Sequence, residues 1–173
     1  DPPPRFSRAR LHLDDGGVLH LVDLRLFGRL RLVPGARFDE VPELAALGPD
    51  PLEEGIDPAR LAAGLARSRL PVKVRIMDQA LLPGVGNILA SEGCFRARLD
   101  PRRPARDVSP PEAARLAAAL LEVVHETIAR EDGPEMTYVE EGGENPFLVY
   151  GRAGERCPRC RRGRITRVVQ AQR

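Results

Sequence analysis

The sequence contains no tryptophan, only 4% aromatic residues, three cysteines and two methionines among its 173 residues. A folded core must therefore be built from Leu, Val, Ala and Ile. Long hydrophobic runs are also missing, because the longest uncharged stretch near the centre, residues 80–91, is interrupted by Pro83, Gly84 and Gly86 and is too short to span a membrane. The first residues contain no apolar run of the kind found in signal peptides, so we expect a cytoplasmic protein with no membrane partner.

Lysine is almost absent as well, because 26 of the 27 basic residues are arginine and Lys73 is the single lysine. The formal net charge of +2 hides an uneven distribution, since residues 151–173 carry eight arginines and one acid, Glu155. A block with a charge of +7 over so few residues is typical of a segment that binds a polyanion. The alternative is a solvated, disordered tail. This alternative is less favoured, because the block also contains Cys, Gly and β-branched residues.

Alternating apolar residues predict β-strands near the start of the chain. Residues 8–13 and 18–22 flank a Gly-Gly turn and predict a β-hairpin, and residues 29–33 predict a third strand. Two or three strands cannot form an independent core, so we expect them to belong to a larger sheet. Residues 34–56 are rich in Pro, Gly and acids and are predicted to form a linker.

Helices are predicted after the linker from apolar residues at helical spacing and from capping residues. The first starts at Asp57, and the next three span residues 70–83, 87–100 and 109–133. One further strand is predicted at residues 165–169. The pattern of strands followed by helices indicates an α+β fold.

The segment 72–99 is predicted to be two amphipathic helices joined by a tight turn that contains Gly84 and Gly86. Glycine permits positive φ angles and leaves no side chain to block a close approach. The free N–H groups at the start of the second helix favour an anion such as phosphate, and Asn87 adds a side-chain amide there. This pattern predicts a contact to nucleic-acid backbone that does not read sequence. A plain helical hairpin within a bundle is the alternative.

This segment also resembles a known family. Lys-Val-Arg-Ile-Met-Asp-Gln from Lys73 to Gln79, followed by Pro-Gly-Val-Gly-Asn-Ile-Leu-Ala-Ser-Glu from Pro83 to Glu92, resembles the helix–two-turn–helix signature of the formamidopyrimidine-DNA glycosylase/endonuclease VIII family. The glycine turn is also similar to the helix–hairpin–helix of endonuclease III-like glycosylases. Those enzymes often carry a four-Cys iron–sulfur cluster, and this chain contains no four-Cys run.

The resemblance implies three parts. Residues 1–50 would be the end of an N-terminal β-sandwich domain, residues 51–150 the helix–two-turn–helix DNA-binding domain, and residues 151–173 an incomplete β-hairpin zinc finger. Cys157 and Cys160 match the first half of that finger. A structural zinc site needs four ligands, so we expect a zinc site that is incomplete within this chain.

The resemblance also assigns a role to the loop Asp23–Gly28, which resembles the family's Asp-Pro-Arg-Arg-Phe-Gly loop. That loop enters the duplex where a damaged nucleotide has been turned out, so Phe27 would replace lost stacking and Arg25 would face the orphaned base. Leu24 and Leu26 depart from the family's Pro and Arg. The alternative for Phe27 is a small core residue at the end of a strand.

Four further residues receive roles from the resemblance. Asn87 and Lys73 match residues that lie near bound DNA, Glu92 matches an acid that points into the active site, and Arg173 matches a finger arginine that grips phosphates and assists strand cleavage. We therefore expect Glu92 and Arg173 to be catalytic. The family's nucleophile is an N-terminal proline followed by Glu, and Pro2 does not match it.

The resemblance thus implies a base-excision repair DNA glycosylase with apurinic-site lyase activity that removes oxidised bases of the formamidopyrimidine and 8-oxoguanine type. Its expected partner is damaged double-stranded DNA, and we expect a monomer. The alternative within the same family is a module that binds damaged DNA without cutting it. A ribosomal-type RNA binder with the same hairpin is less favoured, because it would explain neither the Asp23–Gly28 loop nor the Cys-containing segment.

Overall fold

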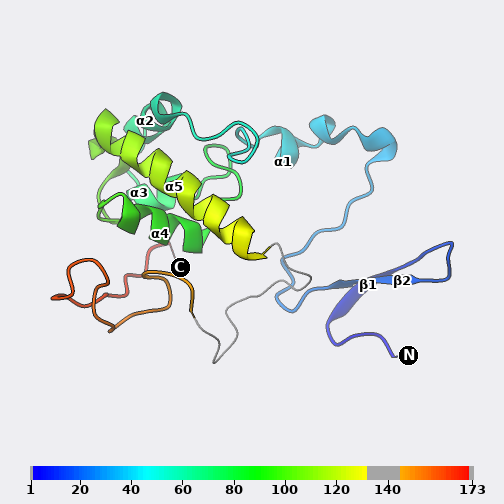
Figure 1. The fold of residues 1–173 in the computed structure, drawn as a ribbon. Helices are drawn as coiled ribbons and strands as arrows, with labels where there is room; N and C mark the ends of the chain where they lie inside the picture. The colour runs from blue at the N-terminus through cyan, green and yellow to red at the C-terminus, as the bar shows by residue number, and fades with distance from the viewer. Residues whose placement is uncertain (1, 132–144, 172–173) are drawn as a thin grey trace. The chain divides into compact units, whose positions relative to one another are not determined.

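The computed structural model describes residues 2–131 and 145–171 of the chain (Figure 1). The chain forms two compact units, Asp1–Val41 and Pro42–Arg173. The division at Val41 lies before the boundary predicted at residue 50, and residues 151–173, predicted as a separate finger, fall within the second unit. Arg173, the predicted arginine of the finger tip, lies outside the described residues, as do residues 132–144.

The first unit contains an antiparallel hairpin of β1 (Ser7–His12) and β2 (Val18–Val22). Its turn is closed by Asp15, whose carboxylate accepts the N–H of Gly17 at 2.7 Å. The predicted third strand at residues 29–33 does not form, and the two strands leave Leu11, Leu19 and other apolar side chains about half exposed. A two-stranded sheet has too little area to bury both of its faces.

The segment predicted as a linker contains short helical turns. Two 3-10 helices span Pro34–Ala36 and Phe38–Glu40, and α1 (Pro42–Ala45) opens the second unit. None of these turns contributes a buried residue. They connect the hairpin to the helical unit without forming a core.

Four helices build the core of the second unit: α2 (Pro58–Ala66), α3 (Val72–Ile76), α4 (Asn87–Arg96) and α5 (Pro110–Glu131). The long helix α5 packs against both α2 and α4 (Figure 1). The largest aliphatic side chains between these helices are at most 1% exposed: Leu61, Leu65, Ile76, Leu116 and Leu120. The predicted core of Leu, Val, Ala and Ile is confirmed. None of the described helices is long and apolar enough to cross a membrane.

Two capping predictions are also confirmed. Asp57 accepts the N–H of Ala59 at the start of α2, at 2.9 Å. Before α5, the carboxylate of Glu112 accepts both the N–H and the hydroxyl of Ser109, at 2.9 and 2.8 Å. These bonds satisfy polar groups that the first turn of a helix leaves without partners.

Two predicted elements are shorter in the structure or do not form. Helix α3 ends at Ile76 instead of continuing to residue 83, because the Asp78 carboxylate accepts the N–H of Ala80 at 3.0 Å and turns the chain. The strand predicted at residues 165–169 is not formed, and a single bridge between Arg156 and Arg164 is the pairing described there.

Candidate nucleic-acid interface

The turn between α3 and α4 is shaped by the side chain of Gln79. Its carbonyl oxygen accepts the N–H of Gly84 at 2.9 Å, and its amide nitrogen donates to the carbonyls of Met77 and Val85 at 3.0 and 3.3 Å. Gly84 has a φ of 76°, which an L side chain rarely adopts. The turn therefore has a fixed shape, and it places the start of α4 at the surface.

The N-terminus of α4 presents free backbone donors. Its first intrahelical bond runs from the N–H of Ala90 to the carbonyl of Gly86, so the N–H groups of Asn87, Ile88 and Leu89 have no partner among the described residues. No side chain caps this end of the helix. A Cβ placed on Gly86 would meet nothing within 4 Å, so the approach to these donors is open. This is the arrangement in which helix N-termini bind anions.

Lys73 and Asn87 complete this site. The ammonium Nζ of Lys73, on α3, donates to the side-chain oxygen Oδ1 of Asn87 at 2.6 Å. This bond uses the side-chain oxygen of Asn87, and among the described residues its amide nitrogen makes no hydrogen bond. Lys73 is only 7% exposed, and burial lowers its pKa. We call Lys73, Asn87 and the three free N–H groups the phosphate clamp.

Glu92 lies one turn further along α4 and is 1% exposed. Its carboxylate accepts three backbone N–H groups: Leu148 at 3.0 Å, Val149 at 2.8 Å and Tyr150 at 2.9 Å. Both oxygens are therefore bonded to the start of the C-terminal arm, which we define as residues 145–171. These contacts are structural, and the predicted catalytic role of Glu92 stays a prediction.

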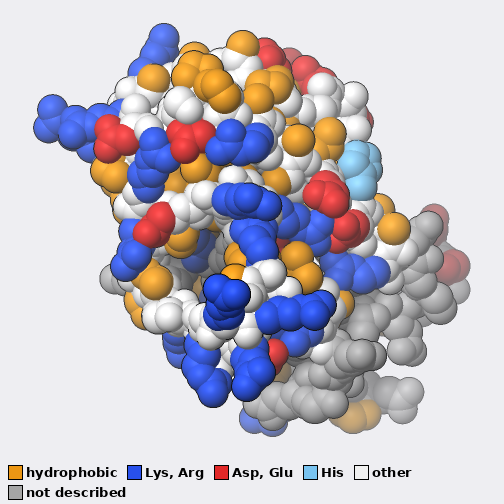
Figure 2. Space-filling view, turned by 60° about the vertical axis from the view of Figure 1, so that its left-hand side comes forward, with side chains coloured by type: hydrophobic (Ala, Val, Ile, Leu, Met, Phe, Trp, Pro, Cys, Tyr) orange, Lys and Arg blue, Asp and Glu red, His pale blue; other side chains and the backbone are white. Residues whose placement is uncertain are grey.

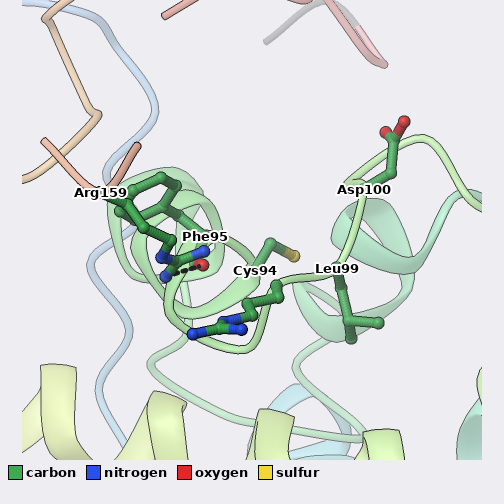
Figure 3. Close-up of a pocket in the computed structure, with 6 residues that line it drawn as sticks. Cys94, Phe95, Leu99, Asp100 and Arg159 are labelled. Carbon is green, nitrogen blue, oxygen red and sulfur yellow. Dashed lines mark hydrogen bonds between the residues drawn. The ribbon is translucent and has the colours of Figure 1, made fainter. Parts of the chain in front are cut away.

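The arm also contacts the C-terminal end of α4. The guanidinium of Arg159 donates to the carbonyl of Phe95 at 2.7 Å and lies 4.2 Å from the centre of the Phe95 ring (Figure 3). Further along, Gln170 donates to the carbonyl of Pro101 at 3.3 Å. Helix α4 thus carries the clamp at its N-terminus and holds the arm at its middle and at its C-terminal end. Sequence reasoning missed Arg159, because its partner is a carbonyl that no motif marks.

The arm is strongly basic at its surface. Figure 2 shows one face of the molecule on which many Lys and Arg side chains gather, with acidic side chains among them. The exposed arginines of the arm are Arg156, Arg159, Arg161, Arg162, Arg164 and Arg167. A cavity of about 610 Å³ lies between the arm and the helices, lined by Lys73 and Asn87 on one side and by Tyr150 and Arg164 on the other. The clamp and the basic arm therefore line the same hollow.

The three cysteines differ in their surroundings. Cys94 is 1% exposed in the core, and burial raises its pKa to about 12, so its thiol stays neutral. Cys160 is exposed, and its sulfur accepts the N–H of Gly163 at 3.3 Å, which together with neighbouring N–H groups lowers its pKa. Among the residues described, no group of three or more His, Cys, Asp or Glu side chains could hold a metal ion. Cys157 and Cys160, the predicted zinc ligands, are two residues where a structural zinc site requires four ligands, so their role in binding zinc stays a prediction.

The predicted wedge residues lie in the first unit, on a loop that follows β2. We call Asp23–Gly28 the wedge loop. Phe27 is 75% exposed, so it is not the small core residue that the sequence left as the alternative. The guanidinium of Arg25 lies 5.0 Å from the centre of the Phe27 ring. Both side chains are therefore presented at the surface together.

A tight helix–turn–helix with free backbone donors at the start of its second helix, followed by an arginine-rich arm, is the arrangement of the helix–two-turn–helix class. Residues 47–138 match the family model described as the formamidopyrimidine-DNA glycosylase H2TH domain. The chain belongs to the formamidopyrimidine-DNA glycosylase family, which confirms the resemblance found in the sequence.

Individual relatives agree with this assignment. The chain is 40% identical to a formamidopyrimidine-DNA glycosylase of Rhodospirillum centenum over 100% of its own length and 61% of that protein. The crystal structure of the MutM (Fpg) protein from Thermus thermophilus matches with a TM-score of 0.82 at 40% identity, over 99% of this chain and 66% of the other. A structure of MutM in complex with DNA containing carbocyclic 8-oxo-G matches with a TM-score of 0.82 at 25% identity, over 100% of this chain and 64% of the other. The chain thus spans less than two thirds of the length of these relatives.

Proposed function

We propose that this chain is the duplex-binding part of a base-excision repair DNA glycosylase with apurinic-site lyase activity. Its substrate would be double-stranded DNA that contains an oxidised base of the formamidopyrimidine or 8-oxoguanine type, and it would act as a monomer. The names of its relatives support the glycosylase activity. The DNA with a carbocyclic 8-oxo-G that is bound to one solved relative supports damaged DNA as the partner.

The observation that carries the proposal is the phosphate clamp. A cation, a side-chain amide and three free N–H groups lie together at the N-terminus of α4, and donors of this kind suit a phosphate. Phosphate contacts of this kind fix the position of a protein on DNA without selecting a sequence. That is what a repair enzyme requires, because damage arises in any sequence.

Two other parts support a role in holding damaged duplex. The wedge loop exposes a flat apolar ring beside a guanidinium, which suits a gap in a base stack. The arm adds exposed arginines on the border of the cavity that the clamp also lines. We propose that Arg173, at the predicted finger tip, continues this set of arginines and assists strand cleavage.

We propose zinc as a structural cofactor of the arm. Cys157 and Cys160 would supply two ligands, and the lowered pKa of Cys160 suits a thiolate, which is the form that binds zinc. When bound, zinc would stabilise the fold of the arm. The described residues hold no further candidate ligand beside these two.

The test of the activity is borohydride trapping with the complete protein that contains this chain, on duplex DNA with one oxidised guanine. The expected result is a covalent protein–DNA adduct, because the lyase reaction passes through an imine that borohydride reduces. If the protein binds the damaged duplex and gives no adduct, the non-catalytic binding module is the correct alternative. If it does not bind duplex DNA, the clamp assignment is wrong.

A further inference from the structure

The wedge loop is built around the side chain of Asp23. The carboxylate oxygen Oδ1 accepts the N–H groups of Arg25 and Leu26, both at 2.9 Å, and Oδ2 accepts the N–H of Gly28 at 2.6 Å. The bond from Gly28 is the main cause that lowers the pKa of Asp23. A carboxylate binds amide donors more strongly than a neutral acceptor does, so all three bonds favour the ionised side chain.

Asp23 is itself fixed to the hairpin. Its N–H donates to the carbonyl of Phe6 at 3.1 Å, and its carbonyl accepts from the Nε of Arg8 at 2.9 Å. The position of the carboxylate is therefore set by the β-hairpin, and the carboxylate in turn sets the loop. The signal in the sequence was an Asp at a strand end followed by a short loop and a Gly, a pattern typical of side-chain turns.

The loop needs this support because its backbone is not rigid by itself. Leu26 has a φ of 58°, in the left-handed region that is unfavourable for a leucine. Position 24 is leucine, so no proline ring restricts the backbone after Asp23. Gly28 is required for the close approach, because a Cβ there would lie 2.9 Å from Oδ2 of Asp23.

We propose that Asp23 is a positioning residue that holds Arg25 and Phe27 in the arrangement in which they enter damaged DNA. The proposal rests on the proposed function of the loop as a wedge. Ordering a flexible loop during binding costs conformational entropy, and a loop that is already ordered avoids this cost. The strained backbone at Leu26 fits this role, because strained residues are often found at functional sites.

The experiment compares two duplexes, one with an abasic site opposite 2-aminopurine and one intact duplex with 2-aminopurine at the same place. The wild-type chain is expected to bind the abasic duplex more tightly and to raise the 2-aminopurine fluorescence, because Phe27 unstacks the base. In Asp23→Asn, the side-chain NH2 cannot accept the N–H of Gly28. We expect its affinity for the abasic duplex to fall by about tenfold and the fluorescence change to be lost, with binding of the intact duplex unchanged.

Gly28→Ala is the second variant, because its Cβ displaces the Asp23 carboxylate without removing it, and the same loss is expected. Asp15→Asn is the matched control, since the carboxylate of Asp15 also accepts a backbone N–H, that of Gly17, in the turn between β1 and β2. It should leave the affinity and the fluorescence change at wild-type values. Loss of the fluorescence change in Asp15→Asn as well would mean that the hairpin fold is responsible, and would overturn the proposal.

A double-mutant cycle separates positioning from general stability. If Asp23 acts through Arg25 and Phe27, then adding Asp23→Asn to the combined variant Arg25→Ala/Phe27→Ala causes no further loss of affinity for the abasic duplex. Additive losses would overturn the positioning role. If Phe27→Ala alone has no effect on either duplex, the wedge function itself fails, whereas an effect of Phe27→Ala with none of Asp23→Asn refutes only the inference drawn here for Asp23.

Discussion

The ammonium of Lys73 donates to the side-chain oxygen of Asn87 at 2.6 Å, which joins the single lysine of the chain to the first residue of α4. The two residues come from different helices and meet only because the turn between them has a fixed shape. Their bond joins a buried cation to the residue that begins α4, where three backbone N–H groups have no partner among the described residues.

Lys73→Met should weaken binding to duplex DNA by a similar factor for every sequence tested, because the clamp is proposed to contact phosphate and to read no base. Methionine retains the apolar stem of lysine, so the fold should persist. The logarithm of the binding constant plotted against the logarithm of the salt concentration should have a slope shallower by about 1, for the loss of one charge at a phosphate. Titrations at several salt concentrations measure this slope. A loss that depends on sequence would contradict the clamp.

Two glycines of α4, Gly86 at its N-cap and Gly93 within the helix, should respond differently to alanine. A Cβ on Gly93 would lie 2.4 Å from the Cδ2 of Leu120, which is fully buried, so Gly93→Ala should reduce the free energy of unfolding by about 2 kcal/mol. Gly86→Ala has open space, and it should change the free energy of unfolding by less than about 1 kcal/mol. Its methyl group would nevertheless obstruct phosphate, so duplex binding should weaken. Urea unfolding and a binding titration of each variant distinguish the two effects.

Glu92→Gln should loosen the start of the arm. The carboxylate accepts three N–H groups, and an amide that replaces it loses the charge and one acceptor. We expect the amide hydrogens of Leu148, Val149 and Tyr150 to exchange at least tenfold faster, as loss of about 1.4 kcal/mol of local protection predicts. The control is Glu122→Gln, whose side chain is 60% exposed on α5. Unchanged exchange in Glu92→Gln would mean that the arm is held mainly by Arg159 and Gln170.

The stability contributed by Glu112 should depend on pH. Arg103 and the N–H of Ser109 lower its pKa from 4.5 to about 2. A carboxyl whose pKa is lowered by folding stabilises the folded state above its ordinary pKa, and this contribution disappears as the pH falls towards the lowered value. Glu112→Gln should therefore lower the free energy of unfolding by about 1 kcal/mol at neutral pH, and the difference from wild type should vanish between pH 4.5 and 2. Unfolding curves at several pH values test this.

Much of the helical unit could be predicted from sequence. The caps at Asp57 and Ser109 and the start of α4 at Asn87 are local features, and the structure has all three. The length of α3 could not be predicted, because apolar spacing continues past Ile76 while the side chains of Asp78 and Gln79 turn the backbone. Strands predicted at residues 29–33 and 165–169 are not formed in the described part of the chain, since a strand requires a partner that alternation alone does not supply.

The sequence by itself determined the family, the glycine turn and the residue types of the clamp, because these depend on local backbone freedom and on the chemistry of single side chains. Only the tertiary structure decided what Glu92 contacts, because its carboxylate bonds to amides more than 50 residues away. The bonds of Asp23 to amides of its own loop are local and follow a pattern that the sequence contains. The bond between Lys73 and Asn87 also depends on the tertiary structure. It forms only after two helices have packed and brought a buried cation to a neighbouring side-chain amide.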